Sequence, residues 1–132
     1  MKIEHAAYQV EDPVGAADWY VKHLGMTVKR AQKDRPFGQF LADSSGTVML
    51  EIYNHPKAAV PDYRKIDPLI VHVAFVVDDV ASTRERLLAA GATAEGDVTT
   101  TDAGDHLAML RDPWGFPVQL VYRRDPMIAA RV

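Results

Sequence analysis

The sequence contains no cysteine, which excludes disulfide bonds, thiolate chemistry and metal sites built on sulfur. It also lacks an apolar run long enough to cross a bilayer. At the N-terminus, Met1-Lys2 leads straight into a strand-like pattern, whereas a secretory signal would need a longer apolar segment there. We therefore expect a cytoplasmic protein that does not enter membranes.

A basic excess is missing as well. The 132 residues include 15 Lys and Arg against 18 Asp and Glu, with a formal net charge of −3 at pH 7. Nucleic-acid binding needs a clustered basic face, so we expect no nucleic-acid partner. The 48% of hydrophobic residues is ordinary for a globular protein. A chain of this length buries about two thirds of its unfolded surface, and we predict one domain, 1–132.

What the sequence does contain is a repeat. Residues 3–12, IEHAAYQVED, return as residues 70–79, IVHVAFVVDD, and this match aligns His5 with His72. Later in each half, a turn sequence leads into a strand that carries one acid or amide, first Glu51 and then Gln119. A repeat that keeps polar residues at matched strand positions indicates two similar modules.

The periodicity predicts the order β-α-β-β-β in each module. Asp12 followed by Pro13 is a typical helix start, and Gly25 suits the helix end. We divide the chain into module one (1–54), a linker with two prolines (55–66), module two (67–125) and a tail (126–132). The predicted helices are 14–24 and 80–90, and the predicted strands are 3–10, 26–29, 40–42, 47–53, 70–77, 93–100, 106–111 and 117–122.

Alternate side chains of a strand share one face of its sheet. On the first strand, Tyr8 and Val10 suit packing under a helix, which places His5 and Gln9 on the opposite face. The same reasoning puts one polar side chain on the non-helical face of three further strands. The resulting set is His5, Glu51, His72 and Gln119. We expect these faces to line a cavity with Gln9, Met49, Tyr53 and Val76.

Two imidazoles and one carboxylate suit Ni, Co, Zn, Mn or Fe(II). If the modules pair about a pseudo-twofold axis, His5, Glu51 and His72 can bind one divalent metal. Gln119 would add its amide oxygen or leave that position to water. Such a site keeps open positions for a substrate, and the metal acts as a Lewis acid. Glu51 is the candidate catalytic proton carrier.

Each residue also has a simpler interpretation. A single strand histidine is more often a hydrogen-bonded structural residue, but two at matched positions favour a metal site. Glu51 lies between Leu50 and Ile52 in an apolar strand, so its charge needs a compensating ion or partner. For Gln119, hydrogen bonding in the cavity wall is the alternative to metal ligation.

Several motifs together resemble one protein family. They are His5, Val10-Glu11-Asp12, Trp19-Tyr20, Leu24-Gly25-Met26, residues 72–78 (HVAFVVD) and residues 112–120 (DPWGFPVQL). The chain is similar in these segments to the vicinal oxygen chelate superfamily. That superfamily includes glyoxalase I, extradiol dioxygenases, methylmalonyl-CoA epimerase and the fosfomycin and bleomycin resistance proteins.

The resemblance implies an α+β fold in which two tandem βαβββ modules form a half-open, mostly antiparallel barrel around one divalent metal, commonly in a homodimer. The family's ligand positions fall on His5, Glu51, His72 and Gln119. The last position is usually Glu, so only Glu51 is left here for proton transfer. Bacterial glyoxalases carry an Arg that holds glutathione where this chain has Gln9, which disfavours glutathione conjugates as substrates.

Three functions remain open. The first is a metal-dependent glyoxalase-like lyase or isomerase that acts on the α-oxygenated carbonyl of a small molecule. The second is an extradiol-type Fe(II) dioxygenase, and the third is a metal-free protein that binds a small molecule such as an antibiotic. We favour the first, because binders of this kind generally lack the full ligand set.

Overall fold

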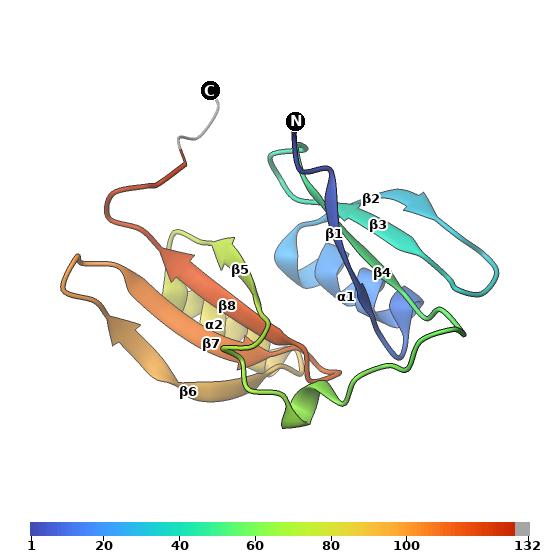
Figure 1. Cartoon of the computed structure of the whole chain (residues 1–132). Coiled ribbons are helices and arrows are strands. Elements are labelled where there is room, and N and C mark those ends of the chain that lie inside the picture. The colour runs from blue at the N-terminus through green and yellow to red at the C-terminus, as the bar shows by residue number, and fades with distance from the viewer. Residues whose placement is uncertain (129–132) are drawn as a thin grey trace. The chain divides into compact units, whose positions relative to one another are not determined.

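The computed structural model describes residues 1–128 and shows an α+β fold with the element order β-α-β-β-β twice over (Figure 1). The chain divides between Pro61 and Asp62 into two compact units. Each unit holds one four-stranded sheet, and neither sheet closes on itself. Two of the three strand pairings in each sheet are antiparallel. The predicted fold class, with two mostly antiparallel βαβββ modules, is therefore confirmed.

In the first unit the strand order is β1-β4-β3-β2, with β1 parallel to β4. Its elements are β1 (His5–Gln9), α1 (Pro13–Leu24), β2 (Thr27–Ala31), β3 (Gln39–Ala42) and β4 (Met49–Tyr53). Strands β1 and β4 are far apart in the sequence but adjacent in the sheet. The edge strands are β1 and β2.

Helix α1 begins and ends where local sequence signals place it. The Asp12 carboxylate accepts a hydrogen bond from the Gly15 N–H, and Gly25 adopts the left-handed conformation with φ 68°. The helix packs on the sheet through small and aromatic residues such as Ala17 and Tyr20. Directly beneath, the core side chains Leu41 and Ile52 are fully buried. One sheet face is thus assigned to the core, and the alternate residues belong to the other face.

The second unit repeats this arrangement, with the order β5-β8-β7-β6 and β5 parallel to β8. Asp79 caps its helix by accepting from the Ser82 N–H. The core between the helix and the sheet includes Leu87 of the helix and Leu110 and Leu120 of the strands. The elements are β5 (Val73–Val76), α2 (Val80–Ala89), β6 (Thr93–Thr100), β7 (His106–Arg111) and β8 (Pro117–Tyr122).

The prediction of a strand over 70–77 was too long at its start. Strand β5 begins at Val73, because a turn around Asp67 governs the residues before it. The Asp67 carboxylate accepts from the Leu69 N–H at 2.9 Å, and its carbonyl accepts from the Ile70 N–H at 2.9 Å. His72 therefore precedes the strand on which it was placed.

The chain segment that connects β4 to β5 contains the short 3₁₀ helix η1 (Tyr63–Lys65), which belongs to the second unit. The predicted module bounds 1–54 and 67–125, with the linker between them, stay a proposal about how the repeat is divided. Of the predicted tail, residues 126–128 form no helix or strand, and 129–132 lie outside the described residues. No helix within residues 1–128 has the length and apolarity to span a membrane.

Candidate functional site

A row of four residues crosses the first sheet on the face away from α1. Strand register pairs Ala7 on β1 with Glu51 on β4, Glu51 with Phe40 on β3, and Phe40 with Arg30 on β2. Directly paired residues share a face, so all four side chains leave the sheet on the same side. His5 lies on this face too, two residues before Ala7. The face away from the helix therefore carries a histidine, a carboxylate, an aromatic ring and a guanidinium.

The structure brings His5 and Glu51 together, although they are far apart in the sequence. His5 Nε2 lies 3.2 Å from a Glu51 carboxylate oxygen, and the two side chains are 35% and 22% exposed. On its other side, His5 Nδ1 lies 3.2 Å from the Glu4 carboxylate. The imidazole is thus held between two carboxylates.

This arrangement bears directly on whether the pair could hold a cation. A neutral imidazole carries one N–H, so it can donate to Glu4 or to Glu51, but not to both. The nitrogen left with a lone pair then faces a carboxylate oxygen, and that contact is unfavourable unless a positive charge lies between them. Either a second proton or a divalent cation relieves it. Imidazole nitrogen and carboxylate oxygen are both ordinary ligands of divalent transition metals.

In the second unit, His72 is oriented in a way that leaves its outer nitrogen available. Its Nδ1 lies 2.8 Å from the Pro68 carbonyl oxygen, which can only accept, so Nδ1 carries the proton. In the neutral ring, Nε2 then has the lone pair. Metal-binding histidines are usually oriented by this kind of hydrogen bond from the second ring nitrogen. The orientation of the His72 imidazole therefore also fits metal ligation through Nε2.

Gln119 lies on β8 between Ala74 of β5 and Met109 of β7, on the sheet face away from α2. It is half-buried, and its neighbours on β8 along the opposite face, Val118 and Leu120, are core residues. The predicted face is thus the one that Gln119 occupies. Within residues 1–128, however, no group of three or more His, Asp or Glu side chains is placed to hold a metal ion. The four-residue site remains a proposal.

The predicted lining residues have varied environments. Met49 and Tyr53 share the His5 face of the first sheet and are half-buried. Gln9 is buried, and its amide donates to the carbonyls of His55 at 3.0 Å and Ala58 at 2.6 Å. Its side chain thus anchors the segment after β4. Val76, in the second unit, is 79% exposed.

Sequence reasoning missed two neighbours of the His5–Glu51 pair. The Phe40 ring meets the His5 ring edge-on, with centroids 5.6 Å apart. On the far side of Phe40, the Arg30 guanidinium carbon lies over the ring, 5.7 Å from its centroid. Alternation within β3 could have placed Phe40 on this face, but only the register between strands places it beside His5.

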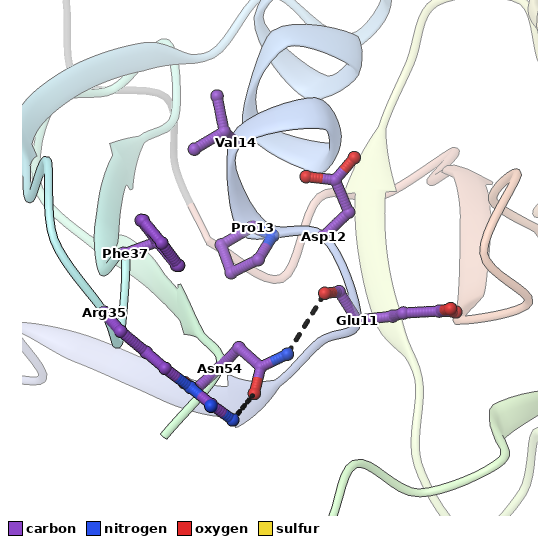
Figure 2. A pocket seen from close by; sticks show the side chains of 7 residues that line it. All are labelled: Glu11, Asp12, Pro13, Val14, Arg35, Phe37 and Asn54. Carbon is purple, nitrogen blue, oxygen red and sulfur yellow. Dashed lines mark hydrogen bonds between the residues drawn. The ribbon is translucent and has the colours of Figure 1, made fainter. Parts of the chain in front are cut away.

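A separate pocket of about 490 Å³ lies in the same unit (Figure 2). Pro13, Val14 and Phe37 give it apolar walls, and Arg35 lies along one edge. Asn54 accepts from Arg35 at 3.3 Å through its side-chain oxygen and donates to the Glu11 carbonyl at 3.1 Å. None of the predicted site residues lines this pocket. Its polar edge is already hydrogen-bonded within the chain.

The family model described as Glyoxalase/Bleomycin resistance protein/Dioxygenase superfamily matches residues 2–120. The chain belongs to this superfamily. The resemblance inferred from the motifs around His5, His72 and Asp112 is therefore confirmed.

Two relatives carry the same name. A protein of Vibrio cholerae named "Probable lactoylglutathione lyase" is 27% identical over 130 residues, which cover 93% of this chain and 91% of the relative. A protein of the same name from Vibrio parahaemolyticus is 25% identical over the same shares of the two chains. The superfamily thus includes lyases to which this chain is similar along nearly its whole length.

Solved structures show the same fold. A glyoxalase family protein from Bacillus cereus superposes with a TM-score of 0.78 at 16% identity, covering 92% of this chain and 93% of the other. An antibiotic-binding protein from a Streptomyces species superposes with a TM-score of 0.72 at 20% identity, covering 93% and 96%. At these identities the likeness concerns the fold alone, which accommodates both proteins.

Proposed function

We propose that this protein is a metal-dependent, glyoxalase-like lyase or isomerase acting on a small molecule with an α-oxygenated carbonyl. The observation that carries the proposal is the contact between His5 Nε2 and the Glu51 carboxylate, 3.2 Å apart on the sheet face opposite α1. Similarity to proteins named as lactoylglutathione lyases supports the same class of reaction.

In this proposal His5 and Glu51 bind one divalent metal together with His72, and Gln119 or a water occupies the fourth position. The metals that suit these ligands are Ni, Co, Zn, Mn and Fe(II), and a bound metal would polarise the substrate carbonyl. The hydrogen bonds at Nδ1 of both histidines would hold the imidazoles in the tautomer that presents Nε2. We extend the proposal to a cytoplasmic homodimer, as is common for this fold.

Glu51 would move the proton. Its carboxylate is partly exposed, so it can contact a substrate while it also contacts His5. It would remove the proton from the hydroxyl-bearing carbon next to the carbonyl and return it to the carbonyl carbon, while the hydroxyl proton passes to the former carbonyl oxygen. The carbonyl and the hydroxyl thereby exchange places without an external oxidant. Proton transfer by a positioned side chain typically contributes about 10²- to 10⁴-fold to the rate.

Glutathione is not part of the proposal. The Gln9 amide is engaged by the backbone of residues 55–58, so it is unsuited to hold an anionic cofactor arm. A neutral amide also binds a carboxylate less strongly than the guanidinium found in glutathione-dependent relatives. A substrate other than a glutathione adduct fits these residues better.

The test is metal uptake and turnover in matched variants. His5→Ala should weaken Ni²⁺ or Zn²⁺ binding by at least roughly 100-fold, since loss of an outer-shell partner alone costs about 10- to 100-fold. Glu51→Gln should abolish proton exchange at C3 of a 2-oxo acid, the carbon next to its ketone, followed by NMR in D₂O. The control is His106→Ala, which removes an exposed histidine from β7 and should change neither result.

The outcomes separate the alternatives. Unchanged metal affinity in His5→Ala would contradict the metal centre. Stoichiometric iron in the purified protein, with catechol-dependent oxygen uptake, would instead indicate the extradiol dioxygenase. Protein that takes up no metal and still binds a small molecule would indicate the metal-free binder.

A further inference from the structure

We propose that Arg30 is the substrate's anion-binding residue, so that the preferred substrates are extended acids. One end of such a molecule would place its α-oxygenated carbonyl at His5 and Glu51, and the other would place a carboxylate on Arg30. This inference rests on the function proposed above and adds a class of substrate to it. It derives from the row of side chains that crosses the first sheet.

The row fixes the direction and the distance. Glu51, Phe40 and Arg30 are directly paired on the consecutive strands β4, β3 and β2, so Arg30 is two strand spacings from Glu51, roughly 10 Å between their backbones. All three side chains leave the same face of the sheet. A small extended molecule on this face can therefore contact Glu51 and Arg30 at the same time.

Phe40 connects the two ends. Its ring touches His5 edge-on at 5.6 Å, and the Arg30 guanidinium lies over the same ring at 5.7 Å. A guanidinium resting on an aromatic face keeps its N–H edge free for a bidentate contact with a carboxylate. The ring also offers an apolar surface on which the carbon chain of a substrate can lie.

No ion pair with an acidic side chain among residues 1–128 accounts for the position of Arg30, and the residue is exposed. By contrast Arg111 and Arg123 are each bound to a carboxylate of their own unit. The Arg30 guanidinium is thus a cation beside the predicted reaction centre that lacks an acidic partner.

The experiment compares two five-carbon probes that differ only in the distal group: 2-oxoglutarate, which has a second carboxylate, and 2-oxopentanoate, which does not. Binding is measured by calorimetry to protein loaded with Ni²⁺ and to metal-stripped protein. We expect the wild type to bind 2-oxoglutarate about 10- to 100-fold more tightly, as a charge-assisted hydrogen-bond pair provides. Arg30→Gln should remove this preference and leave 2-oxopentanoate binding unchanged.

Two further variants make the result specific. Arg30→Lys keeps the charge but loses the paired N–H donors of the planar guanidinium, so it should retain only part of the preference. Lys22→Gln removes one exposed positive charge from α1, on the other side of the sheet, and should retain all of it. Unchanged circular dichroism spectra and urea midpoints would show that the variants fold.

The inference is overturned if the wild type shows no preference, whether it binds both probes or neither, or if Arg30→Gln keeps the preference. Metal content measured on the same samples separates this failure from failure of the proposed function. If metal binds through His5 but no preference exists, the metal centre stands and the anion site falls. If the preference depends on Arg30 but no metal binds, the anion site stands and the lyase proposal falls.

Discussion

Replacing Arg111 by Met should destabilise the second unit more than any surface substitution. The Arg111 side chain is 10% exposed and donates to four acceptors. These are the carbonyls of Tyr63, Ile66 and Gly115 and the carboxylate of Glu95. Methionine fills most of the space of the arginine stem but offers no donor, so each acceptor loses the hydrogen bond from Arg111.

The magnitude follows from the burial of those acceptors. A buried carbonyl left without a donor costs about 1 to 3 kcal/mol, and this cost applies to Gly115, whose bond is buried. The Tyr63 carbonyl loses one buried bond but keeps the one from the Ile66 N–H at 3.1 Å, so its loss is smaller. Ile66 is half-buried, so water can replace part of its bond. Glu95 is 40% exposed, and its ion pair contributes little after solvent screening. We expect the free energy of unfolding to fall by about 3 kcal/mol.

Urea unfolding followed by Trp114 fluorescence, in a Trp19→Phe background, measures this loss because Trp114 lies in the same turn as Gly115. With a typical urea dependence of about 1 to 3 kcal/mol per M, the midpoint should fall by roughly 1 to 3 M. The control is Lys65→Met, since Lys65 is on η1 but 83% exposed. It should change stability by no more than about 0.5 kcal/mol. A loss below about 1 kcal/mol in Arg111→Met would refute the reasoning.

Two further predictions concern the second unit. Gly115→Ala should destabilise by about 2 kcal/mol or more in the same urea assay, because φ is +90° and an added Cβ would lie 2.4 Å from Arg64 Cγ; wild-type stability would contradict the close approach. The hydrogen bond from Arg123, supported by the Arg124 N–H, lowers the pKa of Asp105 below its ordinary 3.8. Because the folded pKa lies below the unfolded one, this stabilisation is present above pH 3.8 and is lost as the pH falls through the folded pKa. Asp105→Asn should therefore show a weaker loss of stability than wild type in urea titrations below pH 4, and identical slopes would count against the pair.

Much of the fold could be predicted because its signals are local. Helix α1 starts at Pro13 behind its Asp12 cap and ends before Gly25, as the sequence indicated. The strands β6, β7 and β8 have the predicted bounds. The start of β5 could not be predicted, since the residues from Ile70 to His72 are as strand-like as those of β5. The Asp67 turn overrides that propensity through two hydrogen bonds.

Only part of the candidate site could be predicted from the sequence. Alternation along each strand was enough to put His5 and Glu51 on the face away from the helix. It could not supply Phe40 or Arg30 as their neighbours, because that depends on how β3 pairs with β4 and β2. The register between β2 and β3 shifts after Val28, and no local pattern in the sequence shows such an irregularity.

By itself, then, the sequence determined the order of the elements, the helix caps and the face on which each strand residue lies, since these depend on residues a few positions apart. Only the tertiary structure decided which strands are neighbours and in what register. Parallel pairing of β1 with β4 joins residues more than forty positions apart and brings the His5 imidazole to the Glu51 carboxylate. Antiparallel pairing then adds Phe40 and Arg30 to the same face. Such contacts depend on loop lengths and on packing of the whole sheet under α1, and short-range sequence patterns do not report either.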